Sequence, residues 1–167
     1  MISLDQYKLF LKSMITELEG DWVLIGGSLL AVINAESRLT SDIDLCSIDE
    51  LSNEKRVSLM KLAELAGLSI EAINPAADYF LKQIPNWKNS LVILQNGAKG
   101  NLYRPSLELY IALKLGRGTA TDIKDCVSFL NWHVKNNIDF DREKIKQMLS
   151  QKVESNPKIN EILGLLK

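Results

Sequence analysis

Trp22-Val23-Leu24-Ile25-Gly26-Gly27-Ser28 begins with four apolar residues and ends in two glycines and a serine. A short, continuous apolar run of this kind is typical of a buried strand. The next stretch, Leu29 to Ala35, predicts a helix, and Ser28 stands at the position of its N-cap. A polar connection then leads to Asp42-Ile43-Asp44-Leu45-Cys46, which predicts a second strand. The region therefore predicts two strands of one sheet joined through a helix.

The carboxylates of Asp42 and Asp44 are two residues apart, so on a strand they share one face while Ile43 and Leu45 face a core. Two adjacent anions repel each other, and a hard cation such as Mg²⁺ relieves that repulsion. An Asp-x-Asp pair also occurs in solvated turns and helix caps. The chain holds a second pair, Asp139-Phe140-Asp141, which precedes a helical stretch and is interpreted as a cap.

Gly26-Gly27-Ser28 lies between an apolar strand and a helix. Glycines at this position let backbone N–H groups approach a phosphate, and a serine hydroxyl can donate to a phosphate oxygen. The alternative interpretation is a tight strand-to-helix turn with a capping serine.

The remaining pattern predicts an α+β protein in which a small mixed sheet of about four to five strands is flanked by helices and followed by a helical C-terminal region. A helix opened by a Ser3–Gln6 capping box precedes Trp22. Further strands are expected at 68–74, 91–95 and 102–103, and helices at 53–66, 75–83, 106–115, 119–134, 142–152 and 157–166. The change of character at Pro105 predicts a core over residues 1–104 and a helical extension over residues 105–167, packed on that core.

Composition excludes several classes of protein. The 167 residues carry a formal charge of −1, which argues against sequence-specific binding to duplex DNA. Cys46, Cys126 and the single histidine, His133, are too few and too scattered for a zinc site. The sequence shows no signal peptide and no apolar run of about 18 residues, so we expect a cytoplasmic protein without a membrane partner.

Taken in order, Gly26-Gly27-Ser28, Arg38-Leu39-Thr40 and Asp42-Ile43-Asp44 resemble the signature of the DNA polymerase β-type nucleotidyltransferase superfamily. The likeness is closest to the small bacterial nucleotidyltransferases that include AbiEii-type toxins. The resemblance implies the nucleotidyltransferase fold. It also implies nucleotide binding by Gly26, Gly27, Ser28, Arg38 and Thr40, and binding of Mg²⁺ or Mn²⁺ by Asp42 and Asp44.

This superfamily usually places a third carboxylate on a later strand, and Glu71 is the natural candidate. It lies in the middle of Leu68–Asn74, among apolar neighbours. As a third catalytic and metal-binding residue it would complete the set formed with Asp42 and Asp44. The alternative is a solvent-facing glutamate on an edge strand, which would leave the third ligand missing.

Lys114-Leu115-Gly116-Arg117, followed by Asp122 and Asp125, resembles a lysine-then-aspartates pattern in the helical part of the AbiEii-type relatives. By that resemblance Lys114 contacts the triphosphate of the nucleotide, and the two aspartates orient neighbouring basic groups. The alternative is a solvated lysine and an aspartate placed at the positive end of a helix dipole.

The function implied is transfer of a nucleoside monophosphate from a nucleoside triphosphate to an acceptor hydroxyl by a two-metal mechanism. An RNA end such as that of tRNA is the favoured acceptor, with a protein or a small molecule as alternatives. Two other functions are open: a non-catalytic nucleotide-binding module, and a partner protein in a toxin–antitoxin pair that binds its cognate toxin or antitoxin through the C-terminal helices.

Overall fold

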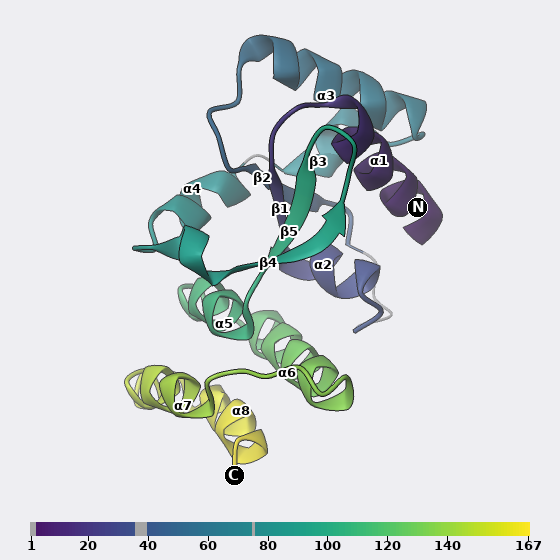
Figure 1. The fold of residues 1–167 in the computed structure, drawn as a ribbon. Coiled ribbons are helices and arrows are strands. Elements are labelled where there is room, and N and C mark those ends of the chain that lie inside the picture. The colour runs from purple at the N-terminus through teal and green to yellow at the C-terminus, as the bar shows by residue number, and fades with distance from the viewer. Residues whose placement is uncertain (1–2, 36–39, 75) are drawn as a thin grey trace. The chain divides into compact units, whose positions relative to one another are not determined.

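The computed structural model describes residues 3–35, 40–74 and 76–167 (Figure 1). Its strands are β1 (Trp22–Ile25), β2 (Ile43–Ser47), β3 (Ile73–Asn74), β4 (Leu91–Asn96) and β5 (Asn101–Pro105). Its helices are α1 (Leu4–Glu17), α2 (Gly26–Val32), α3 (Asn53–Leu65), α4 (Ala77–Lys82), α5 (Leu107–Leu115), α6 (Ala120–Lys135), α7 (Arg142–Ser150) and α8 (Asn160–Leu165). Short 3₁₀ turns lie at Ile70–Ala72, Trp87–Ser90 and Pro157–Ile159.

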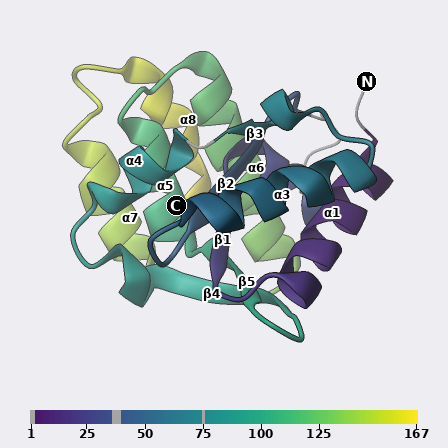
Figure 2. The ribbon, with the colours of Figure 1, turned by 90° about the horizontal axis from the view of Figure 1, so that it is seen from above.

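The five strands form one mixed sheet in the order β3-β2-β1-β5-β4. Strand β1 is central, antiparallel to β2 and parallel to β5, while β3 runs parallel to β2. Helices flank this sheet, and α1 and α3 lie side by side in both views (Figures 1 and 2). The predicted α+β class, with a small mixed sheet followed by helices, is confirmed.

Helix α1 shows how the sequence builds this layer. Ser3 and Gln6 form the predicted capping box, each side chain accepting a hydrogen bond from the other residue's backbone N–H. One face of the helix is buried, and it consists of Tyr7, Phe10, Leu11, Met14 and Ile15. Each large apolar side chain removed from water contributes roughly 1.5–3 kcal/mol, so this face is enough to hold the helix on its neighbours.

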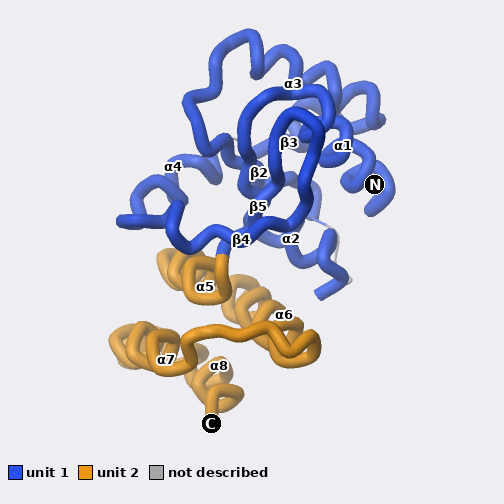
Figure 3. The backbone as a smooth tube through the Cα atoms, viewed as in Figure 1, with its two compact units in different colours: residues 1–105 blue, residues 106–167 orange. Residues whose placement is uncertain are grey.

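The chain divides into two compact units, residues 1–105 and residues 106–167 (Figure 3). The second unit contains α5 to α8, in which α6 packs against α5 and α8. Asp141 caps α7 by accepting a hydrogen bond from the backbone N–H of Lys144, so the prediction that Asp139–Asp141 acts as a cap is confirmed. None of the helices described is both long and apolar enough to cross a membrane.

Two element predictions were wrong. The helix expected from Leu29 begins at Gly26, so the glycines and Ser28 form its first turn and Ile25 is the N-cap. The strand expected over Leu68–Asn74 is reduced to two residues, because Ile70–Ala72 turns as a 3₁₀ helix capped by the Ser69 side chain. A serine hydroxyl that bonds to the backbone two residues on competes with the extended conformation.

The two cysteines are free thiols, and both are buried. Burial raises the pKa of Cys126 to about 12 and raises that of Cys46 above its usual value. The thiolate is the reactive form. Both thiols are therefore expected to react very slowly with Ellman's reagent at pH 8 in the native protein and rapidly in urea. Fast reaction of either thiol without denaturant would contradict this packing.

Candidate active site around Asp44

Asp44 lies where three strands meet. In the sheet register it faces Ile25, the last residue of β1, on one side and Asn74, the last residue of β3, on the other. Its neighbours on β2, Ile43 and Leu45, are buried in the core, and Asp44 itself is half-buried. The strand alternation therefore turns the Asp44 carboxylate to the opposite face from those two apolar side chains.

Gly26 makes room for this carboxylate. A Cβ atom built on Gly26 would lie 1.8 Å from Oδ2 of Asp44 and 2.7 Å from its Cγ. The φ angle of Gly26 is +69°, in the left-handed region that side chains other than glycine rarely adopt. Position 26 therefore demands glycine both for its backbone conformation and for the close approach of Asp44.

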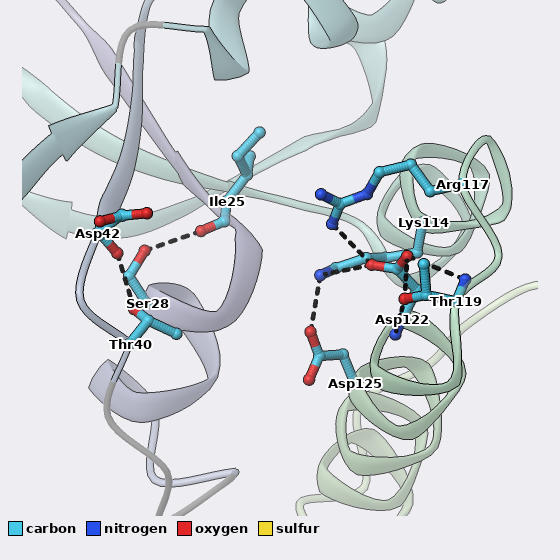
Figure 4. A network of polar contacts seen from close by, with 9 residues as sticks. All are labelled: Ile25, Ser28, Thr40, Asp42, Lys114, Arg117, Thr119, Asp122 and Asp125. Carbon is cyan, nitrogen blue, oxygen red and sulfur yellow. Dashed lines mark hydrogen bonds and ion pairs between the residues drawn. The ribbon is translucent and has the colours of Figure 1, made fainter.

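Ser28, in the first turn of α2, is hydrogen-bonded to both β1 and β2. Its side chain is fully buried, and its hydroxyl donates to the carbonyl of Ile25 at 2.9 Å (Figure 4). The same oxygen accepts a hydrogen bond from the backbone N–H of Asp44 at 3.3 Å. The hydroxyl proton is thus held within the protein, and Ser28 positions Asp44 instead of capping the helix.

The segment before β2 is held by Tyr7 and Thr40. The buried Tyr7 hydroxyl donates to the Thr40 carbonyl. Oγ1 of Thr40 in turn donates to the Asp42 carbonyl at 2.7 Å, as Figure 4 shows. Burial raises the pKa of Tyr7, and the nearby charges of Asp42 and Asp44 raise it further. Asp42 is exposed, so its carboxylate reaches solvent while its backbone is fixed.

Asn74 is the polar residue of this site that the sequence pattern did not reveal. Its amide Nδ2 donates to Oδ1 of Asp44 at 2.8 Å. Its own Oδ1 accepts a hydrogen bond from the backbone N–H of Ala76 at 3.0 Å. Only the pairing of β3 with β2 brings the two residues together, so no local sequence signal was available.

Glu71 does not occupy the place expected of it. The prediction rested on a strand through residues 68–74, whereas Glu71 lies in an exposed 3₁₀ turn. Within residues 3–35, 40–74 and 76–167, no group of three or more histidine, cysteine, aspartate or glutamate side chains is arranged to hold a metal ion. Within the described part of the chain, the side chain found bonded to Asp44 is therefore the Asn74 amide and not a third carboxylate.

The second unit contains a buried ion network centred on Lys114 and Asp122. The Nζ atom of Lys114 lies 2.7 Å from Oδ2 of Asp125 and 3.2 Å from Oδ1 of Asp122 (Figure 4). Arg117 binds the same Asp122 oxygen at 2.8 Å, although its side chain is 67 % exposed. The alternative of a solvated Lys114 is wrong, because the residue is buried and its ammonium group is paired with both aspartates.

Asp122 also completes the start of helix α6. Its Oδ2 accepts hydrogen bonds from the backbone N–H and the hydroxyl of Thr119, as part of a capping box. Burial alone raises the pKa of Asp122, but the hydrogen bonds from Thr119 and Arg117 and the charge of Lys114 outweigh it, so the pKa is lowered. The network therefore holds Asp122 ionised inside the unit.

Three further residues are expected from the sequence to bind nucleotide: Gly26, Gly27 and Arg38. Gly26 and Gly27 lie in the first turn of α2, beside Asp44 in the case of Gly26. Arg38 lies outside the described residues. Of the two aspartates of the sequence motif, Asp44 is the one that the structure places against the glycine turn.

The family of this chain follows from its sequence. The chain belongs to a family described as nucleotidyltransferases of unknown function (DUF6036), whose model matches residues 3–162. The mixed sheet flanked by helices, with its helical C-terminal region, agrees with the α+β nucleotidyltransferase fold. No curated protein and no solved structure matched the chain.

Replacing Gly26 by alanine is expected to destabilise the protein by at least about 2 kcal/mol, because the new Cβ collides with Asp44 and the backbone is strained. Gly164 in α8 is the matched control, since a Cβ there meets no atom within 4 Å. Gly164→Ala should stabilise the protein by about 0.5–1 kcal/mol. Urea denaturation measures both changes. Equal effects of the two substitutions would contradict the close approach at Gly26.

Replacing Asp122 by asparagine is expected to cost about 1–3 kcal/mol at pH 7. Because the folded-state pKa of Asp122 is lowered from its usual 3.8, its contribution to stability is present above that pH and lost as the pH falls further. The difference between wild type and variant should therefore shrink in acid. Unfolding free energies measured from pH 7 down to about pH 2.5 test this, with the exposed Asp139→Asn as control. A pH-independent difference would contradict the assigned ionic network.

Proposed function

We propose that this protein is a metal-dependent nucleotidyltransferase that transfers a nucleoside monophosphate from a nucleoside triphosphate to an acceptor hydroxyl. The family supports nucleotidyl transfer as the general reaction. The observation that carries the finer proposal is the fixed carboxylate of Asp44 against Gly26, with the exposed Asp42 two residues before it. Such a constrained anionic pair beside a glycine turn suits the binding of a cation together with phosphate groups.

The donor set suits magnesium or manganese. Both ions prefer carboxylate oxygens, and Mg²⁺ in proteins is commonly bound through one or two carboxylates together with substrate phosphates. Asp42 and Asp44 supply those carboxylates, whereas the described residues offer no group of three candidate ligands. The set therefore fits a cation that arrives with a triphosphate better than one held by protein ligands alone.

Each residue then has a distinct part. Asp42 and Asp44 would hold the metal, which when bound neutralises phosphate charge and favours attack by the acceptor oxygen. Gly26 and Gly27 carry no side chains that would keep a phosphate from the backbone. Ser28, through its bonds to Ile25 and Asp44, and Thr40, through its bond to Asp42, fix the backbone that carries the two carboxylates. Preorganised charge of this kind is a large contributor to catalysis.

The resemblance to AbiEii-type relatives implied that Lys114 contacts the triphosphate, but its ion pairs favour a structural role. Its ammonium group is already shared between Asp122 and Asp125, so a contact with triphosphate would compete with two ion pairs. We propose that Lys114 mainly stabilises the helical unit. Arg117, with its largely exposed side chain, is the cation of this network that solvent reaches.

The acceptor is proposed from resemblance alone. Likeness of the motif to AbiEii-type relatives favours an RNA end such as that of tRNA, with a protein or small-molecule hydroxyl as the alternative. The same likeness suggests a role in a toxin–antitoxin pair, in which a cognate partner protein binds this chain.

A second candidate function is a nucleotide-binding module without transfer activity. The observation that favours it is the amide of Asn74 beside Asp44, where a further carboxylate would otherwise strengthen metal binding. The two candidate functions predict different results in a labelling experiment, because a binding module binds the nucleotide but transfers no label to an acceptor.

Incubation with each α-labelled triphosphate, Mg²⁺ and a cell extract is expected to transfer label to one class of acceptor, which is RNA, protein or a small molecule. Asp42→Asn should lower this transfer by at least about 100-fold, since it removes a charge that positions the reacting phosphate. Because Asp42 is exposed, the thermal stability of that variant should be unchanged or slightly higher. Asp139→Asn, in the helix-capping Asp-x-Asp pair, is the matched control. Binding of triphosphate without label transfer would favour the binding module.

A further inference from the structure

Asn74 holds the Asp44 carboxylate in a defined orientation. Its Oδ1 is committed to the backbone N–H of Ala76, which leaves Nδ2 to face Asp44. The amide orientation is therefore set by its two partners and not by choice between equivalent atoms. With Gly26 against Oδ2 and the Asn74 amide on Oδ1, both oxygens of Asp44 have a fixed neighbour.

The neutrality of the Asn74 side chain is as important as its position. It is the register partner of Asp44 on the adjacent strand, and its Nδ2 lies 2.8 Å from the carboxylate. An aspartate at position 74 would place a negative oxygen where the present chain places an N–H donor. Two carboxylates that close repel each other unless a cation binds them. The neutral amide thus relieves, within the protein, part of the repulsion that a metal ion would relieve.

We infer that Asn74 is a positioning residue that makes divalent-cation binding at Asp42 and Asp44 depend on a bound triphosphate. This inference rests on the proposed function. In the free protein the amide satisfies Asp44, so little is gained by binding Mg²⁺ or Mn²⁺ alone. When a triphosphate is present, its oxygens supply the ligands that the side chain at position 74 does not.

Three variants separate charge from packing. Asn74→Asp keeps the shape of the side chain, removes the donor and adds a carboxylate beside Asp44. Asn74→Ala removes the donor without adding charge. Asn89→Asp adds the same charge at an exposed residue of the same unit and is the matched control.

The test is the melting temperature of the full chain with and without Mg²⁺ or Mn²⁺, in the absence of nucleotide. Wild type and Asn89→Asp should shift by less than about 1 °C, and Asn74→Asp should shift upward by about 3–6 °C. Asn74→Ala should lie between them, because it removes the amide donor from Asp44 without adding a ligand. If Asn74→Asp does not fold in the absence of metal, recovery of its circular dichroism signal on adding Mn²⁺ is the equivalent measurement. A purely structural role for Asn74 predicts no such gain of metal response.

A shift of wild type by metal alone as large as that of Asn74→Asp would overturn the inference. So would an Asn74→Asp protein that neither shifts nor recovers with metal. The proposed function is tested separately by adding Mg²⁺ with a triphosphate to wild type, which should raise its melting temperature. A further outcome is that wild type shows no rise in melting temperature with Mg²⁺ and triphosphate while Asn74→Asp still responds to metal alone. That result would refute the proposed function but not the effect of the residue at position 74 on cation binding.

Discussion

The close approach of the Asp44 carboxylate to the backbone of Gly26 is the constraint on which the rest of the site depends. It joins the end of β1 to the start of β2 and leaves no space for any side chain at position 26. A half-buried carboxylate is costly unless its oxygens are hydrogen-bonded. The neighbouring strand contributes the Asn74 amide to the carboxylate itself, while the first turn of α2 and the segment before β2 contribute groups that fix the backbone of Asp44 and Asp42.

These contributions come from parts of the chain that are distant in sequence. Ser28 bonds to the backbone of Asp44, and Asn74 bonds to its side chain. Tyr7, from the buried face of α1, anchors Thr40, which in turn bonds to Asp42. The apolar core that holds α1 in place therefore also fixes the segment that leads to Asp42.

In the second unit, residues 106–167, buried charged side chains are stabilised by pairing with one another. Lys114 and Asp122 are both buried, and each is satisfied by more than one partner. Breaking such a network leaves an uncompensated charge in a poorly solvated place, which is strongly destabilising. The pattern that resembles a triphosphate-binding lysine is thus also explained by the internal stability of α5 and α6.

Local sequence was sufficient for features that depend on nearby residues. The capping box at Ser3, the cap at Asp141, the strand at residues 22–25 and the helices after Pro105 follow from short-range patterns, and the structure contains them. The close approach of Gly26 and Asp44, in contrast, is a finding of the structure. Ser28 was expected at the N-cap of α2, whereas it lies in the first turn, where its hydroxyl bonds to Ile25 and to the backbone of Asp44.

Asn74 and Glu71 show what could not be predicted from the sequence by itself. Both lie in one short segment, and the glutamate has the more suggestive chemistry. The 3₁₀ turn at Ile70–Ala72 and the pairing of Asn74 with Asp44 decide which of them faces the aspartate. The sequence alone determined the class of fold, since periodicity and capping act over a few residues, and the resemblance of its motif directed attention to the aspartate pair. Only the tertiary structure decided the partners of Asp44 and Lys114, because strand register and burial depend on contacts between residues far apart in the chain.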